Sequence, residues 1–299
     1  MAVEFPILVS GGSGKLAGLV IEELVALGVP PQQIVTTTRT PDRLAHLAER
    51  GIEVRQADFK QPETLDEAFA GVARALLIST VPDLPFVNLN RFHQHKAAID
   101  AAIRSGVGHV FYTSAPNPGP PFHLFWKQDH YETEEALIRS GLRWTVLRQW
   151  EWPDWHFEID WRPALESGRF LTPRGAGRVN HVTREDCARA IAGALLAEDS
   201  LDRCYDLTGP ASLSAEELAG DLAAVFGKPL EVVHCSDEEY AAYLRARGLD
   251  ETVLPFVADF AKGVRLGRYD GTTDWVERLS GKAPTSIRAF LETEAARLA

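Results

Sequence analysis

Glycines near the start of the chain, in the spacing Gly11-x-x-Gly14-x-x-Ala17, are the first residues that indicate chemistry. An apolar run of strand length precedes them, and a helical pattern of leucines and valines follows. Backbone N–H groups point out of the first turn of a helix, and the helix dipole favours an anion there. Glycine lets a phosphate approach the backbone closely. We therefore predict a phosphate-binding turn made by Gly11, Ser13, Gly14, Lys15 and Leu16.

Arg39 indicates which ligand this turn would hold, because it ends the β-branched run 33–38 that predicts the second strand. In a dinucleotide-binding unit, an acidic residue near this strand end holds the ribose 2′-hydroxyl of NAD, whereas an arginine suits the 2′-phosphate of NADP. A solvated arginine at a strand end is the simpler alternative. The glycine turn upstream favours NADP(H) as the cofactor, with Lys15 as a second positive charge.

Strand and helix patterns alternate along the first half of the chain. We expect strands at residues 5–10, 33–38, 51–57, 73–80, 108–114 and 144–148, with helical patterns between them. The run 73–80 is almost wholly apolar, as in a strand buried on both faces, and Ser79 and Thr80 close it beside the expected ligand crevice. The alternation predicts an α/β fold, a Rossmann-type doubly wound parallel sheet with a smaller, interleaved α+β substrate portion.

The second half of the chain carries shorter patterns. Short strands are expected at 168–171, 178–182 and 230–233, and a capped helix at 183–196. Because no low-complexity linker separates the halves, we expect the substrate portion to interleave with the sheet. The predicted division is an NADP-binding Rossmann domain over residues 1–150 and a mainly substrate-binding portion over 151–299, with segments at about 178–208 returning to the sheet.

The composition argues against several classes of protein. Hydrophobic residues make up 45% of the 299 residues and charged residues 24%, which is typical of a globular protein. A net charge of −11 argues against a nucleic-acid partner, because phosphates need a basic face. The three cysteines lack C-x-x-C spacing, so neither a disulfide framework nor a metal site is expected. No signal peptide or membrane-spanning run is seen, so we expect a cytoplasmic protein, a monomer or homodimer, with no membrane partner.

Several short motifs, in this order, resemble those of the NmrA-like atypical short-chain dehydrogenase/reductases. They are the glycine turn, Thr-Arg-Thr-Pro at 38–41, Val-Arg-Gln-Ala-Asp-Phe at 54–59, Tyr-Thr-Ser at 112–114 and Tyr-Asp-Leu-Thr-Gly-Pro at 205–210. The resemblance covers essentially the whole chain and is strongest to type-2 NADPH:quinone oxidoreductase and triphenylmethane reductase-like members. It implies that Asp58, followed by Phe59, lies against the adenine of the cofactor. A capping or turn aspartate is the alternative.

The proton-donating Tyr-x-x-x-Lys pair of typical short-chain reductases is missing, since none of the six tyrosines has a lysine four residues later. The resemblance places Trp126 and His130 where that pair would fall. It therefore implies His130 as a polar group near the nicotinamide, and quinone-reductase-like members also carry His there. A helix histidine packed against Glu134 is the alternative. Ser114 or water could also supply a proton.

The absence of the pair favours acceptors that need little acid catalysis. Hydride delivery to a ketone leaves a strongly basic alkoxide, whereas delivery to a quinone leaves a phenolate whose conjugate acid has a pKa of about 10. Five of the seven tryptophans fall between residues 144 and 161. Trp150 and Trp152 could stack on a flat aromatic substrate, as could Trp126, or they could serve only to dock a helix on the sheet.

The sequence thus predicts an NADPH-dependent oxidoreductase that transfers a hydride to a quinone-like or conjugated aromatic carbonyl acceptor. Two alternatives stay open. One is a non-catalytic NADP-binding redox sensor of NmrA type, which the missing pair would suit. The other is a ketoreductase for a specialised aromatic metabolite that uses a nonstandard acid.

Overall fold

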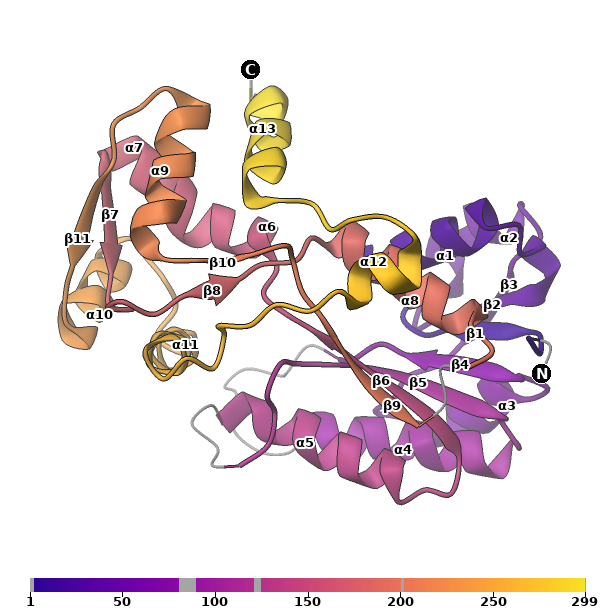
Figure 1. Cartoon of the computed structure of the whole chain (residues 1–299). Coiled ribbons are helices and arrows are strands. Elements are labelled where there is room, and N and C mark those ends of the chain that lie inside the picture. The colour runs from indigo at the N-terminus through magenta and orange to yellow at the C-terminus, as the bar shows by residue number, and fades with distance from the viewer. Residues whose placement is uncertain (1–2, 81–89, 121–124, 200–201, 299) are drawn as a thin grey trace.

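A parallel sheet of seven strands organises the computed structural model, which describes residues 3–80, 90–120, 125–199 and 202–298 (Figure 1). The strand order is β3-β2-β1-β4-β5-β6-β9, and each neighbouring pair is parallel. This confirms the predicted Rossmann-type α/β fold. The strands are β1 (Ile7–Val9), β2 (Ile34–Thr38), β3 (Glu53–Gln56), β4 (Arg74–Leu77), β5 (His109–Ser114), β6 (Arg143–Gln149) and β9 (Arg203–Leu207).

Helices cover both faces of this sheet, each over its own apolar core (Figure 1). On one face lie α1 (Lys15–Ala26), α8 (Arg184–Leu196) and α12 (Trp275–Ser280). On the other lie α3 (Leu65–Phe69), α4 (Asn90–Arg104) and α5 (Phe125–Ile138). The central strands are buried on both faces, which explains why their sequences are continuous apolar runs.

Short helical turns lie in the connections between β1, β2, β3 and β4. A 3₁₀ turn at Pro41–Leu44 leads into α2 (Ala45–Ala48), in the helical pattern expected between the second and third strands. Two more 3₁₀ turns lie at Pro31–Gln33 and Pro62–Thr64. Each begins with proline, whose fixed φ suits the first position of a helical turn.

The smaller portion has its own core and two small sheets. β7 (Arg169–Thr172) pairs in parallel with β11 (Glu231–His234), and β8 (Val179–Asn180) pairs antiparallel with β10 (Ser212–Leu213). Trp161, Phe170 and Leu222 are among its buried apolar side chains. Its helical segments are α6 (Pro153–His156), a π-helical stretch at Phe157–Trp161, α7 (Arg162–Ser167), α9 (Ala215–Phe226), α10 (Asp237–Ala246), α11 (Leu254–Arg265) and α13 (Ile287–Leu298).

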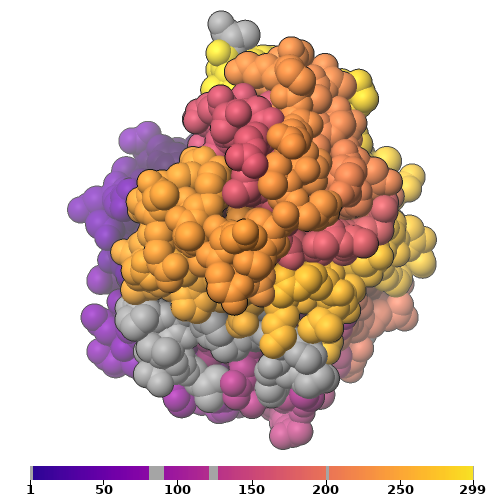
Figure 2. Space-filling view, turned by 90° about the vertical axis from the view of Figure 1, so that its left-hand side faces the viewer, coloured from indigo at the N-terminus to yellow at the C-terminus, as the bar shows by residue number. Residues whose placement is uncertain are grey.

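Figure 2 faces this smaller portion, whose orange and yellow surface covers the upper part of the view. Serine caps mark the start of two of its helices, and a threonine cap marks the start of α8 on the large sheet. Ser214 and Ser236 form capping boxes with Glu217 and Glu239, and the Thr183 side chain caps α8. Because each cap is a local sequence signal, the starts of these helices could be predicted closely.

β9 is the strand by which the second half of the chain rejoins the large sheet. Its residues pair with Thr145–Gln149 of β6, from Thr145 opposite Arg203 to Gln149 opposite Leu207. The boundary at residue 150 and the substrate-binding role of 151–299 stay predictions. Of the helices in the described ranges, none is long and apolar enough to cross a membrane.

Candidate functional site

The strand order reverses between β1 and β4, and ligands of open α/β sheets bind at the carboxyl edge where this happens. The two strand ends are joined there by Ser10, whose Oγ accepts a hydrogen bond of 2.8 Å from the Ile78 amide. The chain turns from β1 into α1 directly above this point. The predicted glycine turn therefore lies at the switch point of the sheet.

The glycines of this turn hold a backbone shape that other residues would disturb. Gly11 has a φ of +69°, and a Cβ added to it would meet no atom within 4 Å, so the space beside its backbone is open. Gly12 is the opposite case, because its Cβ would overlap Thr36 Oγ1 and lie 2.9 Å from Leu44 Cδ1. Gly14 is the N-cap of α1 and supplies no side-chain cap. The arrangement fits a phosphate held by backbone N–H groups.

The end of β2 brings positive charge beside this turn. Ser13 Oγ lies 3.4 Å from Thr38 Oγ1, which ties the turn to the strand that ends at Arg39. Arg39 and Lys15 are both exposed, and neither forms an ion pair with any residue that the structure describes. The residues present therefore fit a dinucleotide with a 2′-phosphate: N–H groups at the start of α1 would face the pyrophosphate, and the two cations would lie near the ribose end.

The other predicted cofactor residues follow the ends of β3 and β4. Asp58 forms a local turn, in which its Oδ1 accepts from the Lys60 amide at 3.0 Å. The turn alternative is therefore present, and the adenine contact of Asp58 stays a prediction. Phe59 packs partly buried against the core under α3 and α4. Ser79 lies at the end of β4, where its amide donates to Thr113 Oγ1 of β5 at 2.8 Å.

Thr80 connects the crevice to a buried network of polar side chains. Its amide donates to His95 Nε2 at 3.0 Å, so this nitrogen carries no proton and a neutral His95 is protonated at Nδ1. That Nδ1 faces Thr133 Oγ1 at 3.0 Å and the Tyr112 hydroxyl at 3.3 Å. Burial lowers the pKa of His95 well below its ordinary value, and the Arg91 charge adds to this.

His130 belongs to the same network. Arg91 Nη2 donates to its Nε2 at 2.9 Å, so the proton of a neutral ring is on Nδ1, 2.8 Å from the Tyr112 hydroxyl. Burial is the main cause of a pKa well below the ordinary histidine value, followed by the Arg91 charge. His130 is therefore neutral at physiological pH and engaged by Arg91 and Tyr112, an arrangement that positions these groups. Its direct proton donation stays a prediction.

Ser114, the second predicted catalytic residue, is also engaged. Its Oγ donates to Glu134 Oε1 at 2.6 Å, and Arg148 binds both oxygens of the same carboxylate, at 3.0 and 2.6 Å. Glu134, which we considered as a partner for His130, thus pairs with Arg148 of β6 instead. This buried chain links β5, α5 and β6 and holds the Ser114 hydroxyl toward Glu134.

The predicted aromatic residues lie in different surroundings. Trp150 is 6% exposed, belongs to the core shared by α1 and α8, and donates from Nε1 to Asp206 at 3.1 Å. Trp152 packs against the same core, with the Arg184 guanidinium 4.1 Å above its ring. These contacts give both indoles a packing role, and stacking on a substrate stays a prediction. Trp126 lies in α5, but its side chain is outside the part of the chain that the structure describes.

The structure brings together two residues that we did not single out. Lys127, at the start of α5, is buried with its Nζ 4.2 Å from the ring centroid of Tyr269. The Tyr269 side chain is fully buried, and its hydroxyl has no hydrogen-bond partner among the described residues. No spacing rule could have paired residues so far apart in the sequence.

Burial and nearby charges shift the pKa values of both residues. Burial lowers the pKa of Lys127 to about 7, against the opposing effect of Glu151. Burial raises the pKa of Tyr269 well above the ordinary tyrosine value, so its hydroxyl stays protonated. Across the described ranges, no group of three or more His, Cys, Asp or Glu side chains is placed to hold a metal ion.

Comparison with known proteins agrees with the geometry of the turn. Residues 11–198 match a family described as NAD(P)H-binding. Quinone oxidoreductase 2 of Escherichia coli K12 is 32% identical over 282 residues, covering 94% of this chain and 96% of that protein. The NAD(P)H azoreductase of Xenophilus azovorans is 25% identical over 97% of this chain and 98% of its own.

A solved structure shares nearly the whole fold. The triphenylmethane reductase of Citrobacter sp., complexed with NADP(H), superposes with a TM-score of 0.88 at 31% identity, covering 97% of this chain and all of the other. The similarity therefore extends through the smaller portion, beyond the cofactor-binding half.

Proposed function

The chain belongs to the NAD(P)H-binding family, and from that membership we propose that it transfers a hydride from NADPH to a quinone-like or conjugated aromatic acceptor. Its relatives are named oxidoreductases and reductases, and the chain is an NAD(P)H-dependent oxidoreductase like them. Bound NADPH would supply the hydride at its nicotinamide ring.

The choice of NADPH rests on one observation: exposed cations stand beside a glycine turn at the switch point. Arg39 follows the β2 end that Ser13 contacts, and Lys15 begins α1. A guanidinium can bind a 2′-phosphate through two parallel hydrogen bonds, which a 2′-hydroxyl cannot reciprocate. The triphenylmethane reductase with NADP(H) bound supports the same assignment.

The choice of acceptor rests on what the relatives have in common. Quinones, azo compounds and triphenylmethane dyes are all conjugated, so the electron pair of a hydride is spread over a large π system. Such acceptors need less help from an acid than a simple ketone does. This agrees with a chain that has no Tyr-x-x-x-Lys motif and whose His130 is neutral and buried.

A non-catalytic NADP-binding sensor is the second candidate. The observation that favours it is that both predicted acids, His130 and Ser114, are already hydrogen-bonded to buried partners. A sensor would need only the cofactor end of the crevice and a response in the smaller portion.

NADPH oxidation, followed by absorbance against benzoquinone, naphthoquinone and aromatic ketone acceptors, tests the proposal. We expect turnover with quinones, slower turnover with ketones, and a preference for NADPH over NADH. NADPH binding without turnover on any acceptor of the panel would reject the reductase assignment in favour of the sensor. Equal use of NADH and NADPH would reject the role of Arg39.

A further inference from the structure

Lys127 and Tyr269 meet at the carboxyl edge of the sheet although they come from opposite halves of the chain. Lys127 Nζ donates to the Pro116 carbonyl at 2.5 Å, and Pro116 lies in the segment that follows β5. The charges that act on Lys127 include Glu151, which follows β6, and Asp206, at the end of β9. The pair therefore lies above the ends of β5, β6 and β9, on the edge where the cofactor turn also lies.

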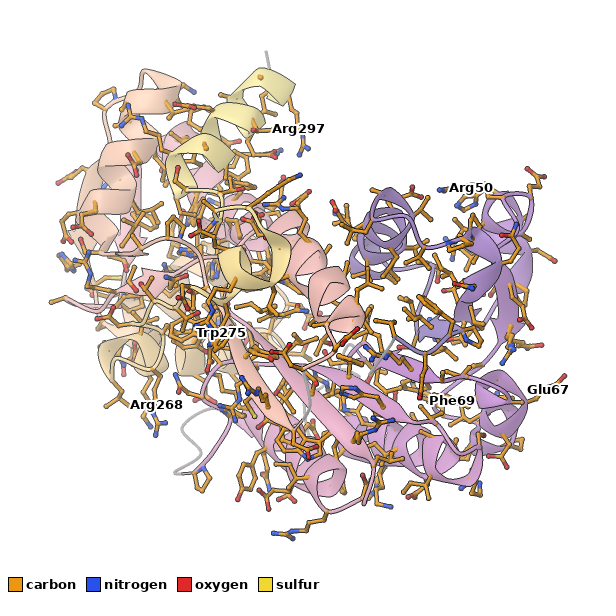
Figure 3. The ribbon with its side chains drawn as sticks, turned by 45° about the vertical axis from the view of Figure 1, so that its right-hand side comes forward. Arg50, Glu67, Phe69, Arg268, Trp275 and Arg297 are labelled. Carbon is orange, nitrogen blue, oxygen red and sulfur yellow. The ribbon has the colours of Figure 1, made fainter. Side chains whose placement is uncertain are left out.

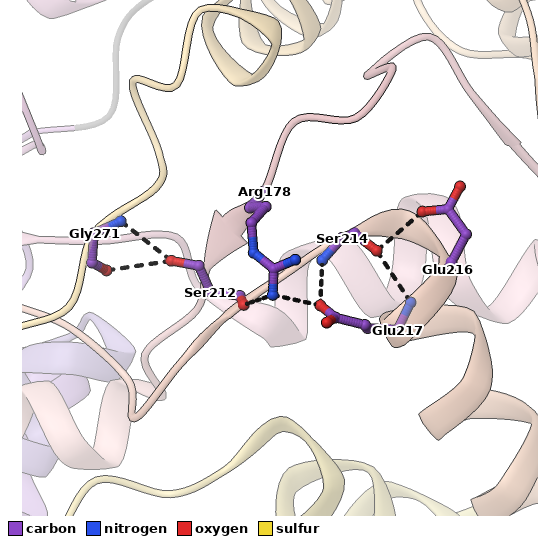
Figure 4. Close-up of polar contacts among 6 residues, drawn as sticks. All are labelled: Arg178, Ser212, Ser214, Glu216, Glu217 and Gly271. Carbon is purple, nitrogen blue, oxygen red and sulfur yellow. Dashed lines mark hydrogen bonds and ion pairs between the residues drawn. The ribbon is translucent and has the colours of Figure 1, made fainter.

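Hydrogen bonds on both sides fix the segment that carries Tyr269. The Asn117 side chain donates to the Arg268 carbonyl at 2.9 Å, and the Asn180 amide donates to the Tyr269 carbonyl at 2.9 Å. Gly271 donates from its amide to Ser212 Oγ at 3.1 Å (Figure 4). Tyr269 is thus held between the β5–α5 connection and the small β8–β10 sheet.

Arg178 strengthens the same anchor. Its Nη2 donates to the Ser212 carbonyl at 2.7 Å and to the Glu217 carboxylate at 2.6 Å, which joins β8, β10 and α9 (Figure 4). The ring of Tyr269 also packs edge-on against Phe260 of α11, with centroids 4.7 Å apart. Its orientation is therefore set by several elements of the smaller portion.

The Tyr269 hydroxyl, which has no hydrogen-bond partner among the described residues, is not explained by the stability of the fold. A buried hydroxyl without a partner costs about 1–3 kcal/mol compared with a satisfied one. A buried ammonium is disfavoured because it loses hydration. Groups of this kind are frequent where a ligand completes their hydrogen bonds.

The geometry points to Lys127 and Tyr269 as catalytic residues of the proposed reductase, which bind and protonate the acceptor oxygen that becomes anionic on hydride transfer. This inference rests on the proposed function. The Tyr269 hydroxyl donates a hydrogen bond to that oxygen, and the Lys127 ammonium gives it a proton. The pair thus defines the substrate class as conjugated carbonyl compounds whose oxygen reaches the ends of β5 and β6.

The step balances in atoms and charge. The C–H bond of the dihydronicotinamide breaks and its electron pair forms a new bond to hydrogen on the acceptor. The π electrons of the conjugated carbonyl move to the oxygen, which takes a proton from Lys127 Nζ. NADPH is oxidised to NADP⁺, the acceptor is reduced, and the neutral amine regains its proton from water.

The pKa of Lys127 suits a residue that donates a proton to the acceptor oxygen. With a pKa held at about 7 by burial, the amine can give its proton to a phenolate-like oxygen and take another at neutral pH. Protonation is required, so the rate should fall as pH rises above about 7. The groups facing Lys127 are the Tyr269 ring, the Pro116 carbonyl, Glu151, Asp206 and Arg268.

Turnover of two variants with benzoquinone, naphthoquinone and an aromatic ketone tests the inference. Lys127→Met should lower kcat about 10-fold with a quinone and about 100-fold with an aromatic ketone, whose alkoxide is more basic. Its rate should also lose the decline above pH 7. Tyr269→Phe should lower kcat/KM about 10-fold without loss of thermal stability, because its hydroxyl has no partner among the described residues.

Matched controls are Lys96→Met, on the exposed side of α4, and Tyr243→Phe, on α10, whose hydroxyl accepts from Arg247. Both should keep wild-type rates. Wild-type kcat and pH dependence in Lys127→Met and Tyr269→Phe would overturn the inference.

Binding of 4-nitrophenol, a phenol whose anion is yellow, separates this inference from the proposed function because it needs no turnover. In the presence of NADP⁺, the wild type should bind the anion and lower its apparent pKa, and Lys127→Met should bind it at least 10-fold more weakly. Lys127-dependent binding in a protein that turns over no quinone would support the anion site and reject the reductase. Equal binding by wild type and both variants would reject the anion site.

Discussion

The predicted phosphate-binding turn and the Lys127–Tyr269 pair lie on the same edge of the sheet but differ in burial and in origin. Lys15 and Arg39 are exposed, and both lie in the same βαβ unit as the glycines. Lys127 and Tyr269 are buried and come from different halves of the chain. In Figure 3, Arg50, which follows α2, is labelled at the right, and Arg268, the residue before Tyr269, at the left.

The difference shows that exposed and buried cations of one fold suit different chemical roles. An exposed cation keeps its ordinary charge and attracts an anion, so it suits a phosphate that is charged throughout the reaction. A buried amine changes its protonation easily, so it suits an oxygen that is charged only briefly. We expect substitutions at the turn to change binding, and those at the buried end to change rate or stability.

Gly12→Ala should give the largest effect, because its new Cβ would overlap Thr36 Oγ1, which is fixed by a 2.9 Å bond to the Val9 carbonyl. We expect NADPH affinity to fall at least ~100-fold and stability to fall by about 2 kcal/mol. Fluorescence titration with NADPH and thermal unfolding measure the two effects. Gly220→Ala in α9, where a Cβ meets nothing within 4 Å, is the control. Wild-type affinity in Gly12→Ala would mean that the turn does not hold the cofactor.

His130→Ala tests whether His130 acts as a proton donor or only stabilises the fold through its hydrogen bonds. The change leaves Arg91 Nη2 and the Tyr112 hydroxyl without His130, so we expect a loss of about 2 kcal/mol in the free energy of unfolding. Denaturant unfolding measures this, with the exposed His93→Ala as the control. A lower rate at unchanged stability would instead assign His130 to catalysis, as the sequence predicted.

Arg39→Glu tests the exposed cations beside the glycine turn and should give the smallest of the three effects. We expect NADPH affinity to fall about 10-fold more than NADH affinity, which is about 1.4 kcal/mol, because the new carboxylate repels only the 2′-phosphate. Titrations at two salt concentrations should show the gap shrink as screening increases. Arg43→Glu, which is also exposed, reverses a charge nearby and should leave the ratio unchanged. Equal losses for both cofactors would contradict the assigned role.

The same contrast explains which parts could be predicted from the sequence. The glycine turn, the place of Arg39 at the end of β2 and the succession of strands and helices in the first half follow from local patterns, because each depends on residues close together in the chain. The partners of Ser114 and His130 could not be derived from the sequence. Ser114 meets Glu134, and His130 meets Arg91 and Tyr112, only when helices pack on the sheet. The clustering of tryptophans in the sequence could not show whether Trp150 faces a substrate or the interior. Its indole packs in a core.

The position of β9 also has a consequence during synthesis. A nascent chain ending before residue 203 has made β6, but its outer edge, residues 145–149, still lacks the strand that pairs with it. An unpaired strand edge is a template for association with other chains. The ribosome must therefore deliver more than fifty further residues before β9 covers this edge. A fragment cut near residue 150 would carry the same bare edge, and we expect it to aggregate even though it contains the whole glycine turn.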